Sequence, residues 1–294
     1  MANNIAFAEK YTGELDKMIV QTAKTGFLAD NAFKAKFSGS KTVYLPEISM
    51  SGLGNYSRTD GYPKGDTTLV YTPYNLSQER ATQLFMDAQD ADESGIPDLV
   101  GKMVGEFTRT QAVPEIDAYN LSALYKVAEG KSNVKTYSAD TAVKSLLELI
   151  NGAEAAMEYD GSTSLVAMVD PTLYNLLMTT TELQRFIIPS DFKQGGIDLK
   201  VKNLNGCSII PVAASRMKSE YNFNTDGFAP TDGAKEVRAI VLPKDSASFV
   251  KKVDKINVLN PNQVEDYDAY KINFRMYYDL IVKNSRKGTI FALA

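Results

Sequence analysis

The sequence predicts an α+β protein that carries a long β-hairpin outside its compact core. Segments 41–48 and 67–76 alternate apolar and polar residues and are rich in β-formers, which is typical of strands. The segment between them, 49–66, contains four glycines and a proline among polar residues, which favours turns and loops. A two-stranded hairpin alone is marginally stable in water, so this arm needs a partner surface. In a homo-oligomer, that surface can belong to the next copy of the chain.

Tyrosines and charged residues gather in the same hairpin region. Tyrosine combines a large apolar face with a polar tip and is enriched at protein interfaces. We therefore interpret these side chains as a candidate subunit interface: Tyr44, Tyr56, Arg58, Asp60, Tyr62, Lys64, Asp66 and Tyr71. Packing of the tyrosines within the hairpin itself is the alternative, but a lone hairpin has little core to pack against.

A long, kinked helix is predicted after the hairpin. Ser94 can cap its start, and Pro97 is tolerated in the first turn. Apolar residues then recur at helical spacing and form a core stripe: Leu99, Val100, Met103, Val104 and Phe107. Pro114 should kink or restart the helix, because it lacks the N–H that would bond to residue 110. The apolar face continues to Gly130.

Helices and strands alternate in the second half of the chain. A helix follows Asp140, a buried strand covers 165–169, and Asp170 with Pro171 starts another helix. The Asn-Gly pair at 205–206 predicts a tight hairpin, and 236–242 is a further strand. This alternation favours an α/β layer. The polar segment 221–234 is expected to be a surface loop.

The first residues leave two interpretations open. Apolar residues in 5–24 recur at loosely helical spacing. The segment can be an amphipathic helix that packs on its own core, or an arm that reaches under a neighbouring subunit.

This order of elements resembles the major capsid protein of tailed bacteriophages, in the fold named after phage HK97. The resemblance covers nearly the whole chain and depends on element order, not on a chemical motif. It implies an N-terminal arm (1–40), a hairpin called the E-loop (41–76), a P-domain with a long spine helix and sheet (77–139), an α/β A-domain (140–243) and a return to the P-domain (244–294). The return would include the closing strands 270–282 and 288–293.

The resemblance implies a structural protein that forms hexamers and pentamers of itself in an icosahedral shell. Such a shell encloses double-stranded DNA in the virion and is assembled in the host cytoplasm. The implied partners are a scaffolding protein and a portal, with decoration proteins left open. Some members crosslink an E-loop lysine to a neighbour's asparagine; Lys64 with Asn260 or Asn262 would be the pair here, which the sequence leaves undecided.

Two alternatives remain. An encapsulin-like bacterial compartment shares the fold and holds a cargo enzyme. A small-molecule enzyme with an α/β domain is disfavoured, because the chain has no histidine for a Ser-His-Asp, Cys-His or His-based metal device. Cys207 is the single cysteine and is expected to be buried and inert. The acidic residues Asp87, Asp90, Asp92 and Glu93 are interpreted as a solvated helix start. We therefore expect no enzyme activity, no cofactor and no metal.

Charge and hydropathy exclude other classes. The formal net charge of −4 argues against a basic surface that grips nucleic acid, so enclosure of DNA would not involve sequence-specific binding. The chain contains no run of about 18 apolar residues, so the sequence predicts no membrane-spanning helix. The N-terminus has no basic leader followed by an apolar segment, so we expect no signal peptide.

Overall fold

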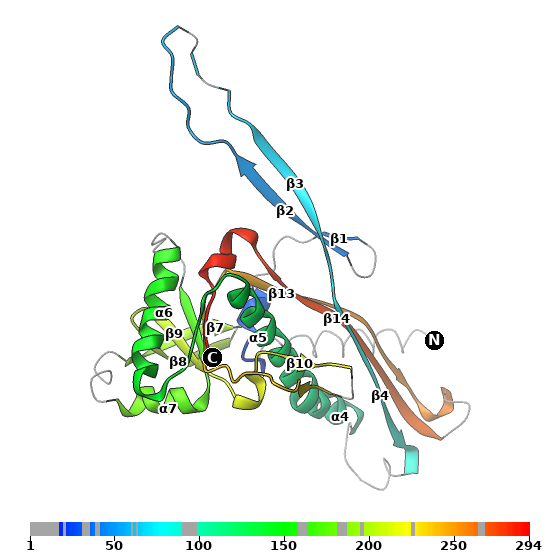
Figure 1. Cartoon of the computed structure of the whole chain (residues 1–294). Helices are drawn as coiled ribbons and strands as arrows, with labels where there is room; N and C mark the ends of the chain where they lie inside the picture. The colour runs from blue at the N-terminus through cyan, green and yellow to red at the C-terminus, as the bar shows by residue number, and fades with distance from the viewer. Residues whose placement is uncertain are drawn as a thin grey trace.

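The computed structural model of the chain describes most residues from 18 onward. The described residues are 18–19, 22–30, 36–38, 42–59, 61–62, 64–89, 99–157, 164–180, 187–194, 197–224, 227–263 and 268–294. The expected helix start at Ser94 and Pro97 lies outside them, as do Asp60, Asp90, Asp92 and Glu93. Helices and sheets are mixed, and one hairpin projects from the rest of the molecule (Figure 1).

The projecting hairpin is formed by β2 (Thr42–Met50) and β3 (Thr67–Asn75). The strands are antiparallel and in continuous register from Thr42 opposite Asn75 to Met50 opposite Thr67. Short strand β1 (Lys36–Ser38) adds to the β2 edge. The predicted strands and the long connection between them are therefore confirmed.

A second sheet lies at the root of the hairpin. Its order is β13 (Ala247–Leu259), β14 (Ala269–Val282) and β4 (Gln78–Asp87), all antiparallel. Only Leu76 and Ser77 separate β3 from β4. The hairpin is thus a continuation of the edge strand of this sheet, as Figure 1 shows.

The long helix runs as α4 (Leu99–Phe107), the π-helical turn η1 (Thr108–Ala112) and α5 (Val113–Gly130). Pro114 lies in the first turn of α5, directly after this π-helical turn. The irregular turn stands where the proline removes an N–H from the regular bonding pattern. The helix is thus interrupted at Pro114 as predicted, but it does not restart, because Phe107, Ala112 and Val113 keep right-handed helical dihedrals.

The third sheet has seven strands in the order β5 (Val134–Lys135), β15 (Phe291–Leu293), β12 (Ala239–Pro243), β6 (Leu165–Val169), β9 (Cys207–Pro211), β8 (Ile197–Leu204) and β7 (Ile187–Gln194). Helices α6 (Ala142–Ala156) and α7 (Pro171–Thr179) contribute to a hydrophobic cluster with it. Short 3₁₀ turns connect further elements: Ala139–Thr141, Ala214–Arg216, Pro261–Gln263 and Asn284–Thr289.

Two local predictions in this region are confirmed. The side chain of Asp170 accepts a hydrogen bond of 2.8 Å from the backbone N–H of Leu173, which is an N-cap of α7. Asn205 and Gly206 have positive φ values of 54° and 81° between β8 and β9, as a two-residue hairpin turn requires.

Three features of this region were not predicted from the sequence. The predicted closing strand at 288–293 forms β15, which pairs with β12 and β5 in the seven-stranded sheet. Strand β7 was not predicted. The expected loop 221–234 contains a small ladder of β10 (Tyr221–Asn222) and β11 (Ala229–Pro230), with Tyr221 buried. Only β15 pairs with segments far away in the sequence; β7 pairs with the next strand, β8, and β10 pairs with β11 seven residues later. The domain boundaries remain predictions.

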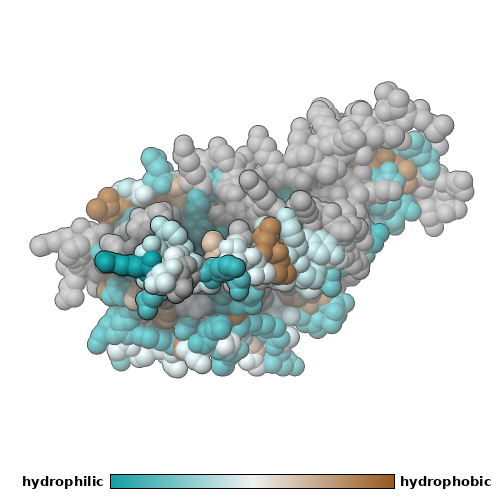
Figure 2. Space-filling view, turned by 90° about the horizontal axis from the view of Figure 1, so that it is seen from above, coloured by the Kyte–Doolittle hydropathy of each residue, from teal (hydrophilic) through white to brown (hydrophobic). Residues whose placement is uncertain are grey.

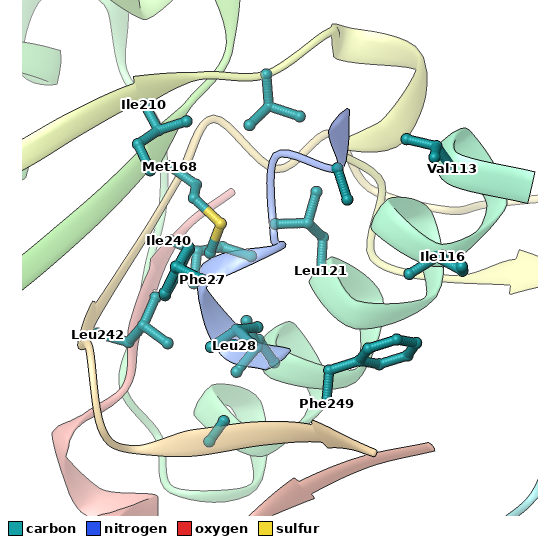
Figure 3. Packing of buried hydrophobic residues seen from close by; sticks show 14 of the residues in the cluster. Phe27, Leu28, Val113, Ile116, Leu121, Met168, Ile210, Ile240, Leu242 and Phe249 are labelled. Carbon is teal, nitrogen blue, oxygen red and sulfur yellow. The ribbon is translucent and has the colours of Figure 1, made fainter. Parts of the chain in front are cut away.

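The largest core joins the early residues to the spine and the sheets. Helix α2 (Phe27–Asp30) places Phe27 and Leu28 among Leu121 of α5 and Ile240 and Leu242 of β12 (Figure 3). Ile19 and Ala23 belong to the same cluster. For these described residues, packing on the chain's own core is the correct interpretation; residues 1–17 lie outside the described part.

Candidate subunit interface

The distal hairpin is exposed on both of its faces. Leu69 and Tyr71 lie on one face of β3 and Val70 on the other, yet each side chain is about half exposed or more. A strand in a stable sheet normally buries at least one face. In the isolated subunit, the apolar side chains of this distal strand pair are therefore exposed to solvent.

Register places most of these apolar residues on one face. Tyr71 lies opposite Pro46, and Leu69 and Met50 are on the same side, because directly opposed residues of an antiparallel pair share a face. The exposed residues on that face are therefore mainly apolar: Pro46, Met50, Leu69 and Tyr71. The other face at the same level carries Thr68, Val70 and Thr72. One side of the hairpin is thus markedly more apolar than the other.

The predicted interface residues lie along this hairpin. Tyr56 and Tyr62 contact each other at the tip, with ring centroids 5.2 Å apart, but Tyr62 remains 88% exposed. Arg58, Lys64, Asp66 and Tyr71 are also exposed, whereas Tyr44 is half-buried near the root. Asp60 lies outside the described residues. Sequence reasoning missed Met50, Leu53 and Leu69, although strand alternation and register were enough to place two of them on one face.

The root of the hairpin is firmly anchored, in contrast to its tip. Val43, Leu45 and Leu76 are buried in a small cluster with Tyr277 and Ile281 of β14. The hydrophobic contact fixes the first part of β2 on the β4–β14–β13 sheet. The exposed part of the hairpin therefore extends from a fixed base.

Polar contacts complete this anchor. The Asp279 carboxylate accepts hydrogen bonds from the Ser77 backbone N–H (2.9 Å) and from the Tyr119 hydroxyl (2.6 Å). The hydroxyls of Ser77 and Tyr119 are 2.8 Å apart. Burial, and then the hydrogen bond to Asp279, raises the pKa of Tyr119 above its usual range. Tyr119 thus stays neutral and ties α5 to the hairpin root.

The predicted spine stripe shows graded burial. Val104 is buried, Met103 and Phe107 are half-buried, and the ring of Phe107 packs on Phe274 of β14 at 5.9 Å. Leu99 and Val100 lie in α4, but the structure does not describe the burial of their side chains. Further buried residues follow on α5: Val113, Ile116, Leu121 and Leu124.

Among the side chains that the structure describes, the thiol of Cys207 and possible metal-ion groups bear on enzyme chemistry. Cys207 is fully buried, and that burial raises the pKa of its thiol. Across the described ranges, three or more histidine, cysteine or acidic side chains nowhere gather as a metal-ion group. No helix in the described part is long and apolar enough to cross a membrane.

Most of the exposed large apolar residues in the described part of the chain lie in the hairpin. Figure 2 shows the molecule from above; on this face, the described residues are mostly hydrophilic and the apolar ones form small separate groups. The hairpin contributes Met50, Leu53, Tyr56, Tyr62, Leu69, Val70 and Tyr71, and the other described segments contribute Met18, Phe85 and Ile188.

No protein-family model and no curated protein matches the sequence. Solved structures do. The capsid of cyanophage P-SCSP1u aligns at a TM-score of 0.57 and 14% identity, covering 88% of this chain and 84% of that one. The mature capsid of bacteriophage PhiM1 aligns at 0.54 and 13%, covering 86% and 82%. The chain has the HK97-like fold. The projecting hairpin lies in residues 41–76, for which the sequence predicts an E-loop, and the α4–η1–α5 helix lies where it predicts the spine.

A further solved structure aligns over nearly its whole length. The structure titled as a virus-like particle from Pyrococcus furiosus aligns at a TM-score of 0.54 and 10% identity. The alignment covers 98% of this chain and 99% of the chain in that structure. At such identities, the likeness establishes the fold.

Proposed function

We propose that this protein is the major capsid subunit of a tailed bacteriophage and assembles through its E-loop with other copies of itself. The observation that carries the proposal is the exposure of apolar residues on the distal E-loop. The root of the same hairpin is anchored on the body of the subunit. The HK97-like fold of phage capsids supports the same role. The shell would be built of hexamers and pentamers, enclose double-stranded DNA in the virion and form in the host cytoplasm. A scaffolding protein and a portal are the expected partners.

Physical considerations favour a second copy as the occupant of the apolar E-loop face. Burying this face removes apolar surface from water, at about 25 cal/mol for each Å². Arg58 and Lys64 are balanced by Asp60 and Asp66 along the tip, so copies can approach without net repulsion from the tip. The body on which the E-loop stands needs no rearrangement, because the root is already anchored.

Paired substitutions test this role. Leu69→Ser changes an apolar residue that is 55% exposed on the E-loop, and Ile188→Ser changes one that is 62% exposed on β7. Both subunits should fold with unchanged circular dichroism. We expect light scattering and negative-stain microscopy to show shells for the natural chain and for Ile188→Ser, with scaffold if required, and loss of shells for Leu69→Ser. A natural chain that stays monomeric at high concentration in all these conditions contradicts the proposal.

An encapsulin-like compartment is the second candidate. The alignment with the virus-like particle from Pyrococcus furiosus over nearly the whole of both chains is the observation that bears on this candidate. The content of purified shells discriminates the two roles: packaged DNA favours the capsid, and a co-purifying cargo enzyme favours the compartment. A neighbouring portal or terminase gene, or a peroxidase or ferritin-like gene, gives the same distinction.

A further inference from the structure

Arg80 of β4 joins three parts of the fold. Its Nε lies 2.6 Å from Oε1 of Glu115 on α5, and its second terminal nitrogen lies 3.2 Å from Oε2. The same side chain donates to the carbonyl oxygens of Phe223 and Gly227, the latter at 2.8 Å. A planar guanidinium has five N–H donors and can make these four hydrogen bonds together, whereas the ammonium group of a lysine has only three donors.

The two carbonyls belong to the flap, defined here as the β10–β11 ladder and the described residues between its strands, that is, 221–224 and 227–230. Figure 1 shows the flap, in yellow, passing along α5, and β10 contacts that helix. At its base, the Tyr221 hydroxyl donates to the Ser215 carbonyl at 2.8 Å, just after β9 of the seven-stranded sheet. At its far end, the flap reaches β4. It therefore bridges the seven-stranded sheet and the sheet that continues into the E-loop.

Aromatic contacts reinforce the far end of the flap. The Phe223 ring packs edge-on against Tyr119 at 5.7 Å, and Tyr119 packs against Tyr278 at 5.3 Å. The Tyr278 hydroxyl donates to Glu115 at 3.0 Å. Tyr119 is also the residue that anchors Ser77 at the E-loop root. A continuous set of contacts thus runs from the flap to the root.

Space remains around this connection. A cavity of about 380 Å³ is lined by Arg80, Glu115 and Gly227 together with Phe107 and Phe274, and a more open hollow of about 700 Å³ lies between Ser77 and Phe223. The flap is therefore held to β4 at few points. Loss of the Arg80 contacts leaves room for the flap and the root to move apart.

We propose that the flap and the E-loop root form one coupled unit through Arg80, so that a displacement of the flap changes the direction of the E-loop. The inference rests on the proposed function, since it assigns to the flap control over how the E-loop meets the next copy. Arg80 acts as a positioning residue: it lies only three positions after Ser77 and makes no contact of its own with another copy in this scheme.

A pair of glycine substitutions tests the coupling from the flap side. Gly227 and Gly233 both have φ of +82° and open space around the position of an added Cβ. Alanine is strained at such a φ, so each substitution should disturb the local backbone. Of the two glycines, only Gly227 accepts a hydrogen bond from Arg80, through its carbonyl oxygen. Hydrogen–deuterium exchange of the unassembled subunit is the readout, because it reports local opening without shell formation.

We expect Gly227→Ala to accelerate exchange roughly tenfold in residues 76–80 as well as in the flap, because coupled sites loosen together. Gly233→Ala should accelerate exchange near residue 233 alone. Arg80→Lys should accelerate exchange in both segments, whereas Arg109→Lys, which changes the exposed pair with Glu106 on the long helix, should not. Unchanged exchange at 76–80 in Gly227→Ala, or an equal change in Gly233→Ala, overturns the coupling. Failure of the natural chain to assemble would instead count against the capsid role.

Discussion

The backbone N–H of Ser77 donates a 2.9 Å hydrogen bond to the carboxylate of Asp279, which lies 202 residues later in the chain. Ser77 is one of the two residues between β3 and β4. Asp279 also accepts hydrogen bonds from Tyr119 and from the N–H of Leu280. Together with the buried cluster of Val43, Leu45 and Leu76, this carboxylate holds the point at which the E-loop leaves the body. This arrangement explains how a hairpin can be exposed at its tip without being loose at its base.

Replacement of this carboxylate should destabilise the subunit measurably. We expect Asp279→Ala to lower the free energy of unfolding by about 1–3 kcal/mol, because it leaves donors at the root without their acceptor. Urea denaturation followed by circular dichroism measures the change. Asp191→Ala, which breaks the exposed pair with Lys200, is the control and should cost less than about 1 kcal/mol. If the two variants lowered the free energy of unfolding equally, the contact at the root would contribute no more to stability than an exposed ion pair.

Stability should fall at alkaline pH because of buried tyrosines. Burial raises the pKa of Tyr119, Tyr221 and Tyr278 above the usual range. Above about pH 10, the unfolded chain loses phenolic protons that the folded chain keeps. The unfolded state then binds fewer protons, so the contribution of these groups to stability is complete below that pH and decreases as the pH rises. Tyr278→Phe should make the decrease less steep.

Denaturant midpoints between about pH 8 and pH 11 provide the measurement for these tyrosines. Tyr62→Phe is the control, because its ring is 88% exposed in the folded chain. Ultraviolet absorbance should show that the buried tyrosines ionise together with unfolding. A Tyr278→Phe variant with the same pH slope as the natural chain contradicts the assignment.

A buried charge on the spine should prevent folding, unlike a change on the E-loop. Val104 is 7% exposed and belongs to the main core. We expect Val104→Asp to cost several kcal/mol and to give insoluble or unfolded protein. Lys102→Asp, at an exposed position of the same helix, should remain soluble and folded. Soluble, folded Val104→Asp would show that this face of α4 is not part of the core.

The sequence was informative where structure depends on nearby residues. Strand alternation predicted β2 and β3, Pro114 predicted the helix interruption, Asp170 predicted a cap, and Asn205–Gly206 predicted a turn. Each of these signals acts over a few residues. Together with the order of elements, they were enough to indicate the fold.

The remaining features depend on distant partners. The three residues of β15 carry no pattern that selects β12 and β5 as neighbours. Arg80 is one of many charged residues in the sequence, and nothing local indicates that it meets Glu115 and the flap carbonyls. The same holds for Ser77 and Asp279 at the E-loop root. For the candidate interface, composition predicted the region, whereas the apolar face required the strand register.

The last prediction concerns DNA. A subunit with a net charge of −4 should bind free double-stranded DNA weakly, because strong binding requires many Lys and Arg contacts that release counterions. We expect no complex in gel-shift titrations of the unassembled subunit at physiological salt. Net charge can conceal a local basic segment, and lysines are frequent near the N-terminus: Lys10, Lys17, Lys24, Lys34, Lys36 and Lys41. Ile19, Phe27 and Leu28 belong to the core, so removal of the whole segment would also damage the fold. Charge reversal at Lys24 and Lys36 is therefore the sharper test. Tight binding by the natural chain, with an affinity that falls steeply with salt and is lost in this variant, would make the segment a DNA-contacting element in place of a passive part of the shell.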